Sequence, residues 1–169
     1  CAIDVRGYGG SDKPWAIEAY DMESMIGDVA GVAAALQPEG RAILIGHDWG
    51  APIVWNSALV RPDRFSAVAA LSVPHIGVPA RPFNEVFDEV FTRRNRFFYQ
   101  AYFQKVGVPE AEYDADPRNF LRRFLFALSG DAKPDSWPND KTADATLLEG
   151  LVDHQRRHQK RFNGVVATI

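Results

Sequence analysis

A short apolar run, followed at once by a glycine-bracketed pentapeptide, is the strongest constraint on how this chain folds. Residues 42–45 are Ala-Ile-Leu-Ile, and Gly46-His47-Asp48-Trp49-Gly50 comes next. A continuous apolar run of this length predicts a strand that is buried on both faces. The following segment, 51–60, is compatible with a helix because Pro52 falls in its first turn. We therefore predict strand, tight turn and helix in direct succession.

The rest of the first half repeats this alternation. Residues 22–36 carry apolar side chains at helical spacing, and Pro38-Glu39-Gly40 ends that helix. Further strands are expected at 2–5 and 67–73, with a glycine-rich loop at 6–14. Strands that alternate with helices predict an α/β protein with a parallel sheet and crossover helices. Three strands make a small sheet whose open edges suggest missing neighbours.

The second half has a different character. Two prolines punctuate a linker, and apolar stripes at helical spacing follow it. We expect helices at 83–103, 117–129 and 144–162. The domain prediction is therefore a partial α/β core over residues 1–79 and a helical module over residues 80–169.

The composition excludes several classes of protein. The net charge is −3, whereas a nucleic-acid-binding domain carries a basic patch. No apolar run is long enough to span a membrane, and no signal-peptide pattern appears. Cys1 is the single cysteine, which rules out an intramolecular disulfide and fits a reducing compartment. We expect a cytoplasmic protein with no nucleic-acid partner and no membrane span. The sequence leaves its oligomeric state open.

Both ends of the chain are apolar. It begins Cys1-Ala2-Ile3-Asp4-Val5, without a methionine, and ends Val165-Val166-Ala167-Thr168-Ile169. We expect these residues to be a piece of a longer protein, in which further strands extend the sheet.

Asp48 occupies the centre of a G-x-nucleophile-x-G pattern, the form of a nucleophile elbow. Such a turn projects the central side chain from the carboxyl edge of the sheet, where open α/β sheets bind ligands. A carboxylate there can displace a leaving group at saturated carbon and form an ester, which water then hydrolyses. The alternative is that Asp48 only caps the helix at 51–60. The strand before it and the helix after it favour the nucleophile.

Several segments together resemble the α/β-hydrolase-fold epoxide hydrolases. Gly46 to Pro52 carries the elbow, and Arg61-Pro62-Asp63-Arg64 and Leu71-Ser72-Val73-Pro74 follow it. The segment from Asp4 to Pro14 looks like the loop after the fourth strand of those enzymes, and Tyr99 to Gln104 looks like part of their helical cap. Haloalkane dehalogenases share the elbow and the loop, but the cap segment is more specific to epoxide hydrolases. The resemblance covers residues 1 to about 130 and implies an incomplete α/β-hydrolase fold with a cap.

The resemblance also implies a mechanism that uses no cofactor. Asp48 would attack an epoxide carbon, and Tyr99 matches the first of two cap tyrosines that donate a proton to the departing oxygen. A tyrosine hydroxyl is protonated at neutral pH and can donate. Trp49 would line the pocket and give its backbone N–H to the oxyanion hole. The apolar stripes of the cap imply a small lipophilic epoxide as substrate, with water as the second reactant.

These aromatic residues also have purely structural interpretations. Tyr102 lies on the apolar stripe with Phe98, which favours a core role over a substrate contact, whereas Tyr99 lies off that stripe. The indole of Trp49 can equally satisfy a local carbonyl.

The four histidines offer no clear general base. His47 precedes the nucleophile and is expected to be structural. His75 follows the third predicted strand and is a weak candidate for the pocket edge. His154 and His158 are spaced i, i+4, which suits a metal on a helix, but charged neighbours favour a solvated face. No third ligand accompanies them, so we predict no metal site.

Several parts of the family pattern have no counterpart in this sequence. They are the His-Gly-x-Pro oxyanion motif, the late histidine base with its acidic partner, and the second cap tyrosine. Without a base, Asp48 would at most form the ester and stall. The alternatives to an epoxide hydrolase are therefore a haloalkane dehalogenase, which needs no Tyr99, and a non-catalytic fragment.

Overall fold

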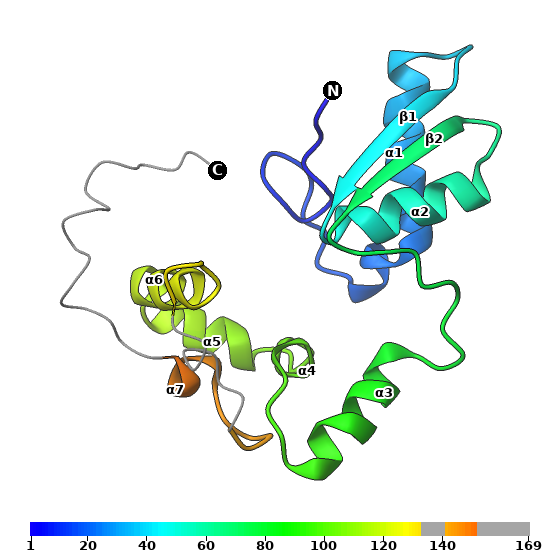
Figure 1. Ribbon diagram of the computed structural model, residues 1–169. Helices are drawn as coiled ribbons and strands as arrows, with labels where there is room; N and C mark the ends of the chain where they lie inside the picture. Colours follow the sequence, from blue (N-terminus) through cyan, green and yellow to red (C-terminus); the bar gives the residue numbers. More distant parts are fainter. Residues whose placement is uncertain (133–140, 152–169) are drawn as a thin grey trace. The chain divides into compact units, whose positions relative to one another are not determined.

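The apolar run and its later counterpart form a parallel pair of strands. The computed structural model describes residues 1–132 and 141–151. Strand β1, Ala42–His47, pairs in parallel with β2, Phe65–Leu71, with Leu44 opposite Val68 and Gly46 opposite Ala70 (Figure 1). The described residues fall into two compact units, one from Cys1 to Gly77 and the other beginning at Val78.

Two helices complete the first unit. Helix α1, Met22–Leu36, is capped by Asp21, whose carboxylate accepts a hydrogen bond from the Ser24 N–H at 2.7 Å. A short 3-10 helix, Ile17–Tyr20, precedes it. Helix α2, Gly50–Val60, connects β1 to β2. These bounds confirm the two helices and the two later strands predicted for this half of the chain.

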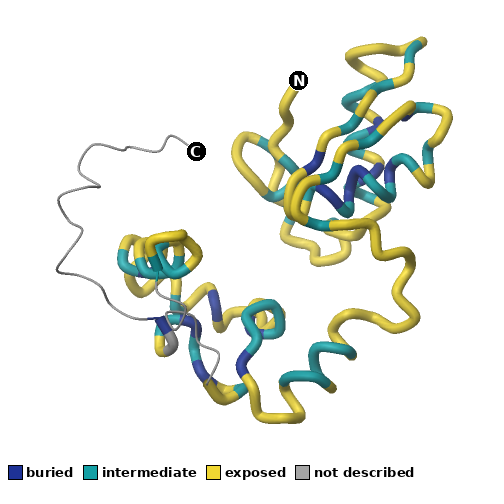
Figure 2. The backbone as a smooth tube through the Cα atoms, viewed as in Figure 1, coloured by how far each residue is buried: buried dark blue, intermediate teal, exposed yellow. Residues whose placement is uncertain are grey.

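The core of the first unit lies along α2, which packs against both strands and against α1. The buried residues of α2 form the dark blue stretch of that helix in Figure 2. They are Ala51, Ile53, Val54 and Ser57. The other face of β1 is open, since Ile43 and Ile45 are 67% and 74% exposed. The alternation along β1 shows that it has one covered face in the described residues, not the two that its continuous apolar run predicts.

The strand predicted at 2–5 is wrong, and the sheet of the described residues has two strands, not three. A strand exists only where a neighbour accepts its hydrogen bonds. Here the segment closes on itself instead. The N–H of Tyr8 donates to the Val5 carbonyl, and that of Gly10 donates to the Asp4 carboxylate at 2.8 Å.

The second unit contains only helices among its described residues. They are α3, Phe83–Val90; a 3-10 turn, Thr92–Arg94; α4, Tyr99–Phe103; α5, Val108–Ala115; α6, Pro117–Ala127; and α7, Leu147–Gly150. Its core consists of Phe97, Tyr102, Phe120, Ala145, Leu147 and Leu151. The helix predicted at 117–129 is confirmed as α6.

Two helix predictions in this unit are wrong. The continuous helix at 83–103 is broken where Asn95 adopts a left-handed φ of 53° and Phe98 becomes extended. Asparagine tolerates that conformation because its short side chain bonds locally. In the helix predicted at 144–162, α7 covers four residues and Leu151 is already extended, with ψ at 126°. Residues 152–162 lie outside the described part.

Helix α5 was missed by the periodicity analysis. It begins after Gly107, which has a φ of 84°, and the Glu110 carboxylate accepts the Gly107 N–H at 2.8 Å. Pro109 in its first turn is a sequence signal for this start. None of the helices in the described ranges combines the length and apolar character that crossing a bilayer requires.

Candidate active site

The turn between β1 and α2 places Asp48 at the carboxyl end of the sheet. Asp48 has a φ of 52°, a left-handed conformation that costs a non-glycine residue about 1–3 kcal/mol. A Cβ on Gly46 would lie 2.2 Å from the carbonyl oxygen of Gly50, so only glycine fits there. A Cβ on Gly50 would meet nothing within 4 Å. The first glycine of the pattern is therefore required by the close approach of two backbone segments, and the second is not.

Three hydrogen bonds hold Asp48 in this conformation. Its N–H donates to the Leu71 carbonyl at 3.3 Å, and its carbonyl accepts from the Ala51 N–H at 3.0 Å. Its carboxylate Oδ2 accepts from the Trp49 N–H at 2.8 Å. The main chain thus fixes both the residue and one oxygen of its side chain, while the side chain stays exposed.

The contacts of Asp48 differ from those of a helix cap. A capping side chain accepts from the second or third N–H of its helix. The cap position of α2 belongs to Trp49, which makes no side-chain cap bond, and the Asp48 carboxylate binds the adjacent N–H. The geometry therefore favours a projecting carboxylate over a capping one.

A second strained residue lies at the same edge of the sheet. Ser72, directly after β2, has a φ of 71°. The bond from the Asp48 N–H to the Leu71 carbonyl joins the two strand ends, so each of these adjacent strands is followed directly by a left-handed residue. Strained backbone of this kind concentrates at functional sites.

The other candidates of the first unit lie around this edge. Trp49 is 68% exposed, which leaves its indole open to solvent. His47 is exposed at the end of β1, and His75 is exposed after β2. The His75 ring contacts the Trp55 ring, with centroids 5.5 Å apart, and Trp55 Nε1 donates to the Val73 carbonyl at 3.4 Å. This contact gives His75 a packing role, and its place at a pocket edge stays a prediction.

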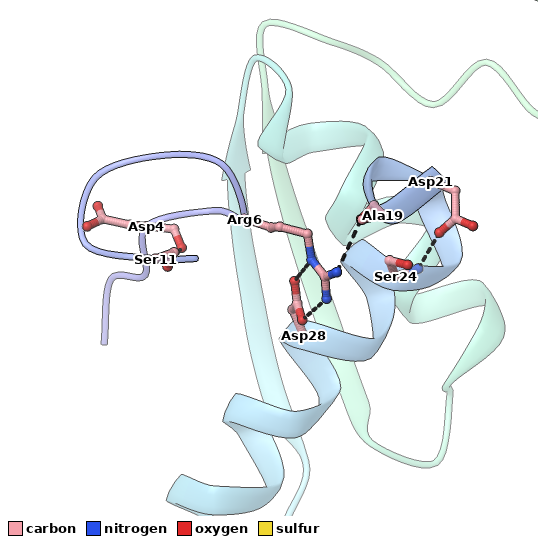
Figure 3. Close-up of polar contacts among 7 residues, drawn as sticks. All are labelled: Asp4, Arg6, Ser11, Ala19, Asp21, Ser24 and Asp28. Carbon is pink, nitrogen blue, oxygen red and sulfur yellow. Dashed lines mark hydrogen bonds and ion pairs between the residues drawn. The ribbon is translucent and has the colours of Figure 1, made fainter. Parts of the chain in front are cut away.

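An arginine clamp holds the glycine-rich loop to α1. Arg6 Nε and Nη2 donate to the two carboxylate oxygens of Asp28 at 2.8 and 2.6 Å, and Nη1 donates to the Ala19 carbonyl at 3.2 Å (Figure 3). The Arg6 hydrogen bonds hold the pKa of Asp28 below its usual range. No local sequence pattern predicts this pair, because its members are 22 residues apart in the chain.

A hollow of about 850 Å³ lies beside the clamp. It is lined by the loop, by one face of α1, including Met25, Val29 and Val32, and by Ile53 of α2. Asp48 is not part of its lining. The hollow is therefore a feature separate from the elbow.

Tyr99 and Tyr102 occupy one short helix in different environments. Tyr99 begins α4 and is partly buried, and its hydroxyl accepts from Gln100 Nε2 at 3.0 Å. Tyr102 is 2% exposed, and its hydroxyl donates to Glu112 Oε2 at 2.6 Å. Burial, followed by that hydrogen bond, raises the pKa of Tyr102 well above its usual range. Tyr102 thus lies in the core, as its place on the apolar stripe predicts.

The contacts of two partly buried charged residues of the second unit, Glu112 and Arg123, were not predicted from the sequence. Glu112 accepts from the N–H groups of Leu147 and Leu148 at 3.2 and 3.0 Å, and Arg123 Nη2 donates to the carbonyls of Leu148 and Leu151. They hold opposite ends of α7. The spacing of these residues along the chain gives no signal of the contact.

The remaining predictions concern histidines and metals. His154 and His158 lie outside the described residues. Within residues 1–132 and 141–151, no three histidine, cysteine or acidic side chains gather as a metal site. The structure thus brings together Asp48 with Trp49, and Tyr99 with Tyr102, each pair within its own unit.

Comparisons with known proteins identify relatives along most of the chain. Residues 1–162 match the family described as alpha/beta hydrolase fold. The chain is 41% identical over 156 residues to Epoxide hydrolase A of Mycobacterium tuberculosis, which covers 90% of this chain and 45% of that protein. It is 41% identical over 126 residues to the Bifunctional epoxide hydrolase 2 of Sus scrofa, covering 75% of this chain and 22% of that protein.

Solved structures give the same picture. The crystal structure of Epoxide Hydrolase A from Mycobacterium thermoresistibile superposes with a TM-score of 0.77 at 41% identity, covering 90% of this chain and 47% of that one. Potato epoxide hydrolase I superposes with a TM-score of 0.69 at 27% identity, covering 89% and 46%. The chain spans less than half the length of each of these relatives.

Proposed function

Because this chain belongs to the alpha/beta hydrolase fold family, we propose that it supplies the nucleophile and the cap of an epoxide hydrolase. In this proposal residues 1–79 form part of the hydrolase core, and residues from 80 onward contribute to the cap. The observation that carries the proposal is the Asp48 turn, with its left-handed φ, its exposed carboxylate and its N–H donor. The names of the similar proteins support the choice of an epoxide as substrate.

The first step is attack by Asp48 on an epoxide carbon. The Trp49 N–H holds Oδ2 at 2.8 Å, so Oδ1 is the oxygen that forms the new bond. The ring C–O bond breaks as the ester C–O bond forms, and its electron pair leaves on the epoxide oxygen. A carboxylate suits this displacement because the reacting centre is saturated carbon.

The departing oxygen requires a proton, because an alkoxide is a poor leaving group in an apolar pocket. We assign this donor role to Tyr99, whose hydroxyl is partly buried at the start of α4. The phenolate that remains recovers its proton from water. Tyr102 is a poorer donor to substrate, since its hydroxyl proton already binds Glu112.

The second step is hydrolysis of the ester. Water attacks the carboxyl carbon, and negative charge develops on the oxygen that faces the Trp49 N–H, so this donor serves as part of an oxyanion hole. The bond between the carboxyl carbon and Oδ1 then breaks, the diol leaves with Oδ1 after taking up a proton, and the water oxygen completes the restored Asp48 carboxylate. A general base must take a proton from that water. No residue of the described chain is assigned this role.

The substrate proposed is a small lipophilic epoxide. Aromatic side chains surround Tyr99, with the Phe98 and Phe103 rings at centroid distances of 5.2 and 6.2 Å. Such surroundings favour apolar substituents on the ligand. The proposed reaction takes water as its second reactant and requires no cofactor. The proposal includes a cytoplasmic location, which fits the single cysteine, Cys1.

The test of this function uses the protein expressed from its complete reading frame. It is incubated with 1,2-epoxyhexane, and the diol is measured by gas chromatography. We expect Asp48→Asn to lower the rate on the order of a thousandfold. Glu39→Gln, which removes an exposed carboxylate of the same unit, is the matched control and should leave the rate unchanged.

A parallel assay separates the two candidate reactions. Halide departs without a proton, so release of bromide from 1-bromohexane would not need Tyr99. Tyr99→Phe should lower diol formation about a hundredfold. Bromide release that is independent of Tyr99, without diol formation, would replace the proposal with a haloalkane dehalogenase. A folded protein that turns over neither compound would contradict an enzymatic role.

A further inference from the structure

One carboxylate in the second unit connects three separate parts of the cap core. Glu112, on α5, accepts the Tyr102 hydroxyl of α4 on Oε2 at 2.6 Å. It also accepts the N–H of Leu147 on Oε2 at 3.2 Å and the N–H of Leu148 on Oε1 at 3.0 Å. Hydrogen bonds to an ionised acceptor are stronger than neutral ones, and partial burial of this group strengthens them further.

Helix α4 depends on such external contacts for its position. It has five residues, Tyr99–Phe103, and a helix that short has almost no stability of its own. Tyr99 and Tyr102 are three residues apart and so lie on neighbouring faces of this helix. Whatever fixes the Tyr102 hydroxyl therefore restricts the rotation of α4 and the direction of the Tyr99 side chain.

Helix α7, whose start Glu112 binds, is also held by other contacts. Arg123 of α6 donates to the carbonyls of Leu148 and Leu151, at the opposite end of α7 from Glu112. Residues 141–151 are attached further by the bond from Phe97 N–H to the Lys141 carbonyl at 2.8 Å and by the bond from Ala143 N–H to Asn95 at 3.2 Å. Glu112 thus links α4 to a segment that the rest of the core already fixes.

We propose that Glu112 is a positioning residue for Tyr99, which it holds in the direction for proton donation by binding the Tyr102 hydroxyl and the start of α7. This inference rests on the proposed function, because it assigns Tyr99 the donor role. Glu112 itself does not contact the reacting atoms. Loss of the Glu112 carboxylate would misplace the Tyr99 hydroxyl and leave Asp48 unchanged. The rate of ring opening should therefore fall most for epoxides whose oxygen is a poor leaving group.

Two epoxides of similar size make that difference measurable. In 1,2-epoxypropane the oxygen departs as a strongly basic alkoxide and needs the donor. In 3,3,3-trifluoro-1,2-epoxypropane the fluorines stabilise the departing oxygen, so the donor matters less. A variant with merely less folded enzyme loses rate on both compounds by the same factor, whereas a misplaced donor changes the ratio of the two rates.

The experiment measures kcat and KM for both epoxides with the protein expressed from its complete reading frame. For Glu112→Gln we expect kcat on 1,2-epoxypropane to fall about tenfold and kcat on the trifluoro compound to fall about twofold, with KM little changed. Tyr102→Phe, which removes the same link from its other end, should shift the ratio in the same direction. The two substitutions combined should cost little more than either alone. Asp114→Asn, an exposed carboxylate on the same helix, is the matched control and should leave the ratio unchanged.

Each outcome supports or overturns the inference. If Glu112→Gln does not fold, Tyr102→Phe carries the test alone, since it keeps the ring in the core. If Tyr99→Phe shifts the ratio but neither Glu112→Gln nor Tyr102→Phe does, the positioning role is wrong and the proposed function stands. If the unaltered protein forms no diol from either compound, the proposed function and the inference fail together.

Discussion

The two units of this chain hold their chemistry-bearing side chains by different means. In the first unit, main-chain hydrogen bonds and one obligatory glycine fix Asp48, and the side chain itself is exposed. In the second unit, ring packing and a single carboxylate fix Tyr99 and Tyr102 on a helix of five residues. The position of Asp48, the proposed nucleophile, should therefore tolerate most nearby side-chain substitutions. That of Tyr99, the proposed proton donor, should be sensitive to several of them.

The largest loss of unfolding free energy should come from adding one methyl group in the turn between β1 and α2. Gly46→Ala places a Cβ 2.2 Å from the Gly50 carbonyl oxygen, and neither backbone segment can move without breaking the turn. We expect the free energy of unfolding to fall by about 3 kcal/mol or more, measured by urea denaturation. Gly50→Ala is the matched control, since its Cβ meets nothing within 4 Å. Equal losses for the two variants would show that the turn is not fixed by this close approach.

In the second unit, the largest loss should come from a side chain. Arg123→Met removes the donors to the carbonyls of Leu148 and Leu151 and keeps much of the side-chain volume. The Leu148 carbonyl keeps the Leu151 N–H at 3.1 Å, but the buried Leu151 carbonyl loses its donor. We expect the unfolding free energy to fall by about 2 kcal/mol. Arg118→Met, at an exposed position on the same helix, should cost less than about 0.5 kcal/mol. If the two variants had the same stability, α7 would not depend on Arg123.

A smaller effect is expected from one hydroxyl, and it depends on pH. Tyr102→Phe should lower the unfolding free energy by about 1 kcal/mol at neutral pH, because it removes a hydrogen bond to a charged acceptor. The pKa of Tyr102 is raised in the folded state, so its contribution is complete below about pH 10, the unfolded value, and declines as pH rises above it. The difference in unfolding free energy between the unaltered protein and Tyr102→Phe should therefore decrease above about pH 10.

Tyr113→Phe gives the comparison for that measurement. Tyr113 is 37% exposed, so this variant removes a hydroxyl near the surface of the same unit. An identical alkaline response of the unaltered protein and Tyr102→Phe would contradict the assigned bond to Glu112.

The smallest effect should be at the arginine clamp of the first unit. Asp28→Asn weakens the two bonds from Arg6, but the Asp28 side chain is 40% exposed, so we expect a loss below about 1 kcal/mol at neutral pH. The folded-state pKa of Asp28 is lowered, so its contribution is present above about pH 4 and disappears as pH falls through the folded value. Chemical denaturation between pH 6 and about pH 3 measures this, and a variant that parallels the unaltered protein throughout would exclude the clamp as a stabilising contact.

Local patterns predicted the fold where local forces decide it. The helix at 22–36 matches α1 because an apolar face and the Asp21 cap are both encoded within it. The strand predicted at 2–5 failed because a strand depends on a partner elsewhere in the chain. The break at Asn95 was hidden by the phenylalanine-rich stripe on both sides, which continues at helical spacing although the backbone does not.

The same distinction applies to the candidate site. The Asp48 turn was predictable because its glycine, its strand and its helix are contiguous. The bonds of Glu112 were not, because its partners lie 10, 35 and 36 residues away in the sequence. Long-range polar contacts of this kind leave no periodic trace.

The group that binds the Asp48 carboxylate is the backbone N–H of Trp49, so its presence does not depend on which side chain position 49 carries. Eighteen of the nineteen possible replacements at position 49 leave that N–H in place, because every residue except proline carries one. Trp49 has a φ of −61°, close to the value that a proline ring imposes. Proline at position 49 would delete the donor and fit that φ, but its ring also restricts the preceding residue and so disturbs the left-handed Asp48. Trp49→Ala isolates the contribution of the indole. Substitutions at this position thus change the side chain beside Asp48, yet almost all of them keep the N–H that binds its carboxylate.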